Sequence, residues 1–107
     1  MTPEQYRDIS LLRSRKEEFV IPVEQGRLLL CAVGLAGEAG EVADHIKKHV
    51  WHGKPLDVDH LVKECGDVFW YLDRLLMLLG VSLEECMQRN VDKLVERYPE
   101  GFKKIDA

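Results

Sequence analysis

Four carboxylates with matched spacing are the residues of this 107-residue sequence best suited to chemistry. Glu38 and Glu41 lie three residues apart, and Glu64 and Asp67 repeat that spacing. Residues three apart share one face of a helix, so each pair would present two carboxylates side by side. Four converging carboxylates repel one another unless a cation lies between them. Hard oxygen ligands suit Mg²⁺ or Mn²⁺, and such a site would also bind the phosphates of a substrate.

A single acidic pair at this spacing is usually only a solvated helix face. The two pairs here lie beside apolar stripes with three- and four-residue steps, which is typical of amphipathic helices. One helix is predicted over residues 22–50, a loop over 51–55, and a further helix from Asp57 or Asp59 to Leu79. A short connection favours antiparallel neighbours, so both pairs should converge at one edge of a bundle.

Two further helices are expected at the ends of the chain. Thr2 reads as an N-cap with Pro3 in the first helical position, and this helix should fray through residues 13–18. Ser82 opens a last helix that is stopped by Pro99. No stretch alternates with period two for long enough to make a strand, so the fold is predicted to be an all-α bundle of about four helices.

Length and charge limit the possible partners. The chain has room for a single domain, residues 1–107, and a chain of this size buries only around two-thirds of its unfolded surface. A site that encloses a substrate should therefore need a second subunit, and we expect a homo-oligomer, either dimer or tetramer. The net charge of −4 argues against a general nucleic-acid or anionic-membrane binder.

The sequence also predicts a location. No apolar run is long enough for a membrane span, and the N-terminus lacks the layout of a signal peptide. The three cysteines are widely separated and form no CxxC motif, as expected for core residues in a reducing compartment. We therefore expect a cytoplasmic protein without membrane or nucleic-acid partners.

Three glycines surround the first acidic pair. Gly34, Gly37 and Gly40 lie inside the predicted helix, where each costs roughly 1 kcal/mol relative to alanine. They suggest close approach by another helix or by a ligand, and tight helix packing alone would also explain them.

Histidines lie near the carboxylates as well. His45 is expected on the same helix face as Glu38 and Glu41, and His60 is expected on the same helix face as Glu64 and Asp67. The spacing of His45, His49 and His52 resembles that of a zinc site, but the sequence has no HExxH motif and His52 is expected in the loop. Zinc is therefore disfavoured.

Residues 34–42 together with residues 63–68 resemble the MazG-like nucleoside triphosphate pyrophosphohydrolases of the all-α NTP pyrophosphatase superfamily. The family pattern is an ExxE, a variable spacer, and an ExxD on the following helix. The spacer here is 22 residues long, and residues 90–102 also look like the segment that closes many of these domains. The resemblance covers about residues 28–102.

This resemblance implies that Glu38, Glu41, Glu64 and Asp67 bind Mg²⁺, with Mn²⁺ as a possible substitute. The family hydrolyses a nucleoside triphosphate, ribo or deoxy, to the monophosphate and pyrophosphate. Glu38 or Glu41 would orient the attacking water or take its proton. Residues expected to bind the substrate are Lys47, Lys48, Lys54, Tyr71, Asn90, Lys93 and Arg97.

One departure from the family pattern leaves details open. Many relatives carry a second glutamate where this chain has Gly37, which puts in doubt the number of metal ions and the identity of the group that activates water. Alternatives are a phosphoribosyl-ATP pyrophosphohydrolase, a dUTPase-like relative, or a catalytically silent helical module for protein association.

Overall fold

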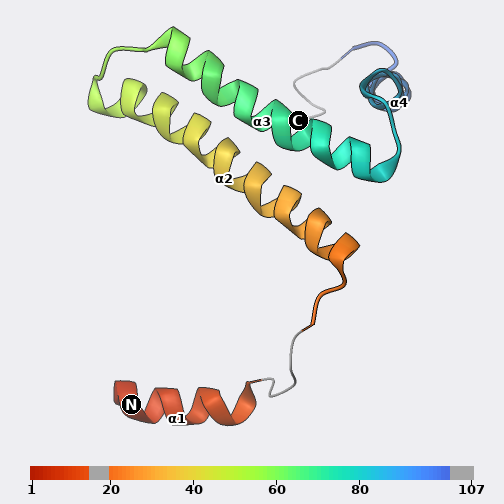
Figure 1. Ribbon diagram of the computed structural model, residues 1–107. Helices are drawn as coiled ribbons and strands as arrows, with labels where there is room; N and C mark the ends of the chain where they lie inside the picture. The colour runs from red at the N-terminus through yellow and green to blue at the C-terminus, as the bar shows by residue number, and fades with distance from the viewer. Residues whose placement is uncertain (15–19, 102–107) are drawn as a thin grey trace.

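The computed structural model describes residues 1–14 and 20–101 and consists of four helices joined by short connections (Figure 1). These helices are α1 (Pro3–Arg13), α2 (Val23–His52), α3 (Val58–Leu79) and α4 (Leu83–Arg97). The described residues include no strand, which confirms the predicted all-α class. Of the fraying expected over residues 13–18, the part from residue 15 onward lies outside the described residues.

The helices begin where capping side chains are available. Thr2 and Gln5 form the predicted capping box, in which the Thr2 hydroxyl accepts from the Gln5 N–H at 3.1 Å. The Asp57 carboxylate accepts from the His60 N–H at 3.0 Å and selects the first of the two caps considered for α3. Ser82 caps α4 in the same way.

The end of α2 differs from the prediction. The helix continues through Trp51 and His52, which were expected in the loop, and stops at Gly53 with φ of 67°. The hydrophobic period breaks at residue 51, but the helix continues until Gly53 adopts the left-handed conformation that commonly ends helices. Gly80, with φ of 69°, ends α3 by the same means.

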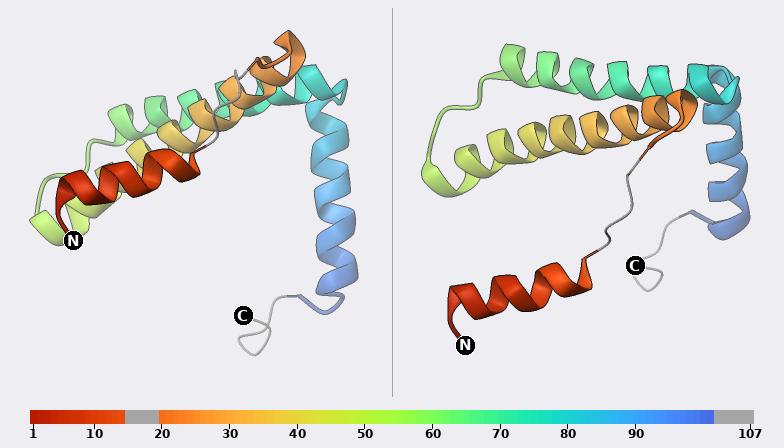
Figure 2. Two further views of the ribbon diagram at one scale, coloured as in Figure 1. Left: turned by 90° about the horizontal axis from the view of Figure 1, so that it is seen from below. Right: turned by 60° about the horizontal axis from the view of Figure 1, so that its bottom comes forward.

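Helices α2 and α3 form an antiparallel hairpin, which is the only extensive helix–helix packing among the described residues (Figures 1 and 2). α4 turns away steeply from the end of α3, and α1 lies apart from the hairpin (Figure 2). The chain therefore holds a two-helix platform from which α1 and α4 extend.

The described part of the chain has very little interior. Only Cys31 and Glu64 are buried, whereas large apolar side chains such as Leu12, Phe69 and Val95 are exposed. The radius of gyration is 20.6 Å, compared with about 13 Å for a compact domain of 100 residues. The described part of a single copy thus leaves many large apolar side chains in contact with solvent.

Candidate functional site

The facing surfaces of α2 and α3 carry most of the predicted site. On each helix one stripe runs the length of the hairpin at alternating three- and four-residue steps. The stripe of α2 comprises Arg27, Cys31, Gly34, Glu38, Glu41, His45 and Lys48. The stripe of α3 comprises His60, Glu64, Asp67, Tyr71, Arg74 and Leu78.

Two contacts define how these stripes pair. At one end, the His45 and His60 rings lie 5.6 Å apart between centroids. At the other, α3 approaches Gly34 so closely that a β-carbon there would overlap the Tyr71 ring. This confirms the predicted close approach at Gly34.

The first acidic pair lies between these two contacts. Both helices are uninterrupted between these two contacts and run antiparallel. A move of three or four residues towards the start of α2 therefore corresponds to an equal move towards the end of α3. In this register Glu41 lies at the level of Glu64, and Glu38 lies at the level of Asp67. Gly37 and Gly40 are different from Gly34, because no atom of another side chain or helix lies within 4 Å of a β-carbon built at either position.

Glu64 is the central carboxylate of this surface. The residue is only 9% exposed, and its Oε1 lies 2.6 Å from His60 Nε2 and 3.6 Å from His45 Nδ1. Its Oε2 is buried and has no hydrogen-bond partner. A buried, unpaired charged oxygen is costly, so this carboxylate favours a cation beside it.

The other three predicted metal ligands are more open. Glu38 is half-buried, whereas Glu41 and Asp67 are exposed. Among the described residues, the group whose ligand atoms lie within 4.8 Å of one another consists of His45, His60 and Glu64. The three remaining carboxylates do not belong to it.

Two predicted phosphate-binding lysines are held by a neighbour that sequence reasoning did not single out. Asp44 Oδ2 lies 2.8 Å from Lys48 Nζ, and its Oδ1 lies 3.7 Å from Lys47 Nζ. The hydrogen bond with Lys48 lowers the pKa of Asp44 and raises the pKa of Lys48. Glu41 and Glu64 also raise the pKa of Lys48, so both carboxylates act on this ammonium group.

The remaining predicted substrate ligands lie at different places. Tyr71 is on the hairpin surface, one turn beyond Asp67. Lys54 belongs to the connection between α2 and α3, where its carbonyl contacts His49. Asn90, Lys93 and Arg97 are on α4, which is not extensively packed on the hairpin.

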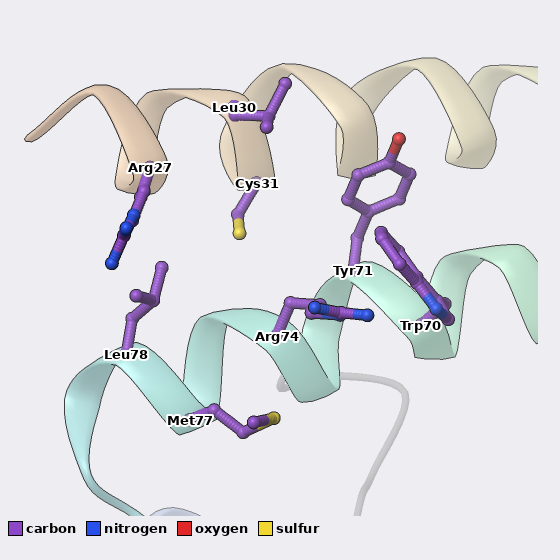
Figure 3. Close-up of a pocket in the computed structure, with 8 residues that line it drawn as sticks. All are labelled: Arg27, Leu30, Cys31, Trp70, Tyr71, Arg74, Met77 and Leu78. Carbon is purple, nitrogen blue, oxygen red and sulfur yellow. The ribbon is translucent and has the colours of Figure 1, made fainter. Parts of the chain in front are cut away.

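A cavity of about 420 Å³ lies between α2 and α3, with Tyr71 in its wall and none of the four carboxylates in its lining (Figure 3). Arg27, Leu30 and Cys31 line it from α2. The lining from α3 is Trp70, Tyr71, Arg74, Met77 and Leu78. The guanidinium carbon of Arg74 lies 4.2 Å from the centre of the Trp70 ring, and the Tyr71 ring meets the edge of the same indole. The walls are mostly apolar, with two cationic groups, which is the usual character of a small-molecule pocket.

Two features of this surface were not foreseen from the sequence. His45 and His60 were predicted to lie on the helix faces of the acidic pairs but were not assigned as ligands. The cavity was not predicted. The sequence signal for these histidines was that each shares a helix face with an acidic pair. No signal indicated how the two helices pair in register.

Comparison with known proteins adds evidence from the sequence. The profile of the MazG nucleotide pyrophosphohydrolase domain matches residues 27–102. The chain is 40% identical over 73 residues to the Gene 37 protein of Mycobacterium phage L5, a match that covers 64% of each chain. The name of that relative states no activity. No solved structure gave a significant match, and no helix among the described residues is long and apolar enough to span a membrane.

Proposed function

Because this chain belongs to the MazG nucleotide pyrophosphohydrolase family, we propose that it hydrolyses a ribo- or deoxynucleoside triphosphate to the monophosphate and pyrophosphate, with Mg²⁺ as the cofactor. Glu38, Glu41, Glu64 and Asp67 would hold the ion. Mn²⁺ has the same preference for oxygen ligands and is a possible substitute.

The unpartnered Oε2 of Glu64 is the observation that carries this proposal. A buried carboxylate oxygen without a donor costs about 1–3 kcal/mol, and more when it is charged. A bound cation would remove that cost, and we propose that Glu38, Glu41 and Asp67, at neighbouring levels of the hairpin, supply further oxygen ligands. The donor set of oxygen atoms thus suits a hard divalent ion.

When bound, Mg²⁺ would neutralise phosphate oxygens and lower the pKa of a coordinated water. Glu38 or Glu41 would orient the attacking water or accept its proton at a carboxylate oxygen. Glu41 is exposed and lies at the level of Glu64 in the inferred register, so we propose that its carboxylate acts on this water.

The cavity beside Tyr71 is the proposed nucleoside site. Its volume of about 420 Å³ lies in the range of small-molecule pockets, and its apolar walls suit a base and sugar. Tyr71 stands between this cavity and the carboxylates, so a nucleotide would lie along the hairpin with its phosphates towards Asp67.

Cationic residues would complete the phosphate site. Lys47 and Lys48 lie on α2, where both pair with Asp44 and where Glu41 and Glu64 raise the pKa of Lys48. Lys54 lies in the adjoining connection. Charged donors of this kind form strong contacts with phosphate oxygens. Asn90, Lys93 and Arg97 are on a helix that leaves the hairpin, so we propose that they serve the site of a second copy.

Association of identical chains follows from the same surface. We propose a homo-oligomer, because many large apolar side chains of the described residues are exposed, and exposed apolar patches mark interfaces. One such surface lies along α4, where Val91, Leu94 and Val95 line a shallow hollow. The wild-type chain is expected to sediment as a dimer or tetramer at micromolar concentration.

Val95→Glu should shift this assembly towards smaller species, because it places a charge on an apolar contact face. Arg89→Gln is the matched control, since it changes the charge of α4 by the same amount without adding a charge to that hollow. Sedimentation velocity measures both variants. A wild-type chain that is monomeric at micromolar concentration would contradict the proposed assembly.

Phosphorus NMR of the standard NTPs and dNTPs, with dUTP added, tests the proposed reaction in the presence of Mg²⁺. Release of a monophosphate and pyrophosphate supports cleavage between the α- and β-phosphates. Release of orthophosphate and a diphosphate contradicts it.

Phosphoribosyl-ATP belongs in the same panel, since hydrolysis of that compound alone identifies a different substrate class. Absence of turnover throughout, together with no stabilisation by Mg²⁺, supports a silent interaction module. A competent metal site gains stability when its ion binds.

A further inference from the structure

Two histidines converge on Glu64 from opposite helices. His45 comes from α2 and His60 from the first turn of α3, and their ring planes are tilted by 32° relative to each other. Both direct a ring nitrogen at the same carboxylate oxygen, Oε1. This leaves Oε2 of Glu64 buried and without a partner.

The three side chains provide two nitrogen atoms and one oxygen atom as ligands within 4.8 Å of one another. Imidazole nitrogen binds first-row transition metals well, whereas Mg²⁺ strongly prefers oxygen. Three protein ligands with a position left for water are also the usual composition of open zinc-type sites.

Access and burial suit a bound ion. The side chains of His45 and Glu64 are only 14% and 11% exposed, so two ligands are fixed by packing. The side chain of His60 is 61% exposed, so it opens the group to solvent on one side. An ion can therefore enter past His60 and find two ligands already in place.

We propose that His45 Nδ1, His60 Nε2 and Glu64 Oε1 form a binding site for a divalent transition-metal ion of the Mn²⁺, Co²⁺, Ni²⁺ or Zn²⁺ class. The site shares Glu64 with the proposed Mg²⁺ site and in that respect rests on the proposed function. Because the histidines face Oε1, the orphaned Oε2 stays available for an ion held by the other carboxylates. Glu64 would then contribute to the binding of two ions, one that accepts nitrogen ligands and one that prefers oxygen ligands.

Cobalt titration of the full-length, metal-free protein tests this site. Co²⁺ bound by imidazole nitrogen shows visible d–d absorption whose intensity and position differ from those of the hexaaqua ion. We expect saturable Co²⁺ binding that persists in a large molar excess of Mg²⁺. His45→Gln and His60→Gln should each weaken the Co²⁺ affinity tenfold or more.

His52→Gln is the matched control, because His52 is an exposed α2 histidine outside the group. It should bind Co²⁺ as the wild type does. His60 is largely exposed, so its replacement should leave the helical content measured by circular dichroism unchanged. Unchanged Co²⁺ affinity in both ligand variants would overturn the proposal and leave the histidines as simple neighbours of Glu64. Complete displacement of Co²⁺ by Mg²⁺ in the wild type would overturn it as well.

The two proposals fail in different ways. Lack of pyrophosphate release by the wild type in Mg²⁺ alone counts against the proposed reaction, whatever the Co²⁺ titration shows. Equal Co²⁺ affinity in the wild type and in the His45 and His60 variants counts against the histidine site, whatever the activity is.

Discussion

Glu64→Gln is expected to lower pyrophosphate release about a thousandfold or more, while the helical content stays unchanged. Glutamine keeps the size of the side chain but removes the charge that would hold the cation. Loss of a metal contact worth about 4 kcal/mol in the transition state corresponds to roughly a thousandfold in rate. Initial rates of pyrophosphate formation in Mg²⁺ measure the effect.

A stability measurement separates lost metal binding from damage to the fold. The wild type should gain thermal stability when Mg²⁺ is added, because the ion binds only the folded chain. Glu64→Gln should gain much less. Glu84→Gln, which changes an exposed carboxylate in the first turn of α4, serves as the control and should behave as the wild type. Full turnover by Glu64→Gln would show that the cation lies elsewhere.

Gly34→Ala is expected to cost about 2 kcal/mol of stability. Its β-carbon would overlap the Tyr71 ring, so either the ring or the whole of α3 must move. Overpacking of this kind commonly costs about 1–3 kcal/mol. For a chain of this size, a 2 kcal/mol loss corresponds to a fall in Tm of about 10 °C, measured at matched protein concentration.

Gly37→Ala and Gly40→Ala are matched controls on the same helix. No other side chain or helix lies within 4 Å of a β-carbon at either position, so alanine should raise stability by up to about 1 kcal/mol through its better helix propensity. If Gly37→Ala proved more damaging than Gly34→Ala, the pairing of α2 with α3 described above would be wrong.

Sequence periodicity was sufficient to predict the helices, because helix formation depends on local spacing. It did not predict burial, because the apolar faces of α1 and α4 stay exposed in this chain. The caps at Thr2 and Ser82 follow from short-range hydrogen bonds and were predicted correctly. The end of α2 was predicted two residues early, because polar and aromatic residues near its end interrupt the hydrophobic pattern without interrupting the backbone hydrogen bonds. Gly53 was the better signal for the true end.

The candidate site was only partly predictable. Burial of Glu64 and its contact with His45 depend on how two helices pair across the 53–57 connection, which neither helix specifies alone. A shift of one turn along α3 would bring His45 to a different neighbour while leaving every hydrophobic stripe intact. The position of α4 could be predicted even less well from the sequence, because few contacts within the chain determine it.

The small interior has a kinetic consequence. With only Cys31 and Glu64 buried among the described residues, a solitary chain lacks the apolar burial that ordinarily offsets conformational entropy. Folding to a stable structure should then be a second-order process, in which chains must associate before any of them is stably folded. Refolding half-times should shorten as the chain concentration rises, and the denaturation midpoint should rise with it.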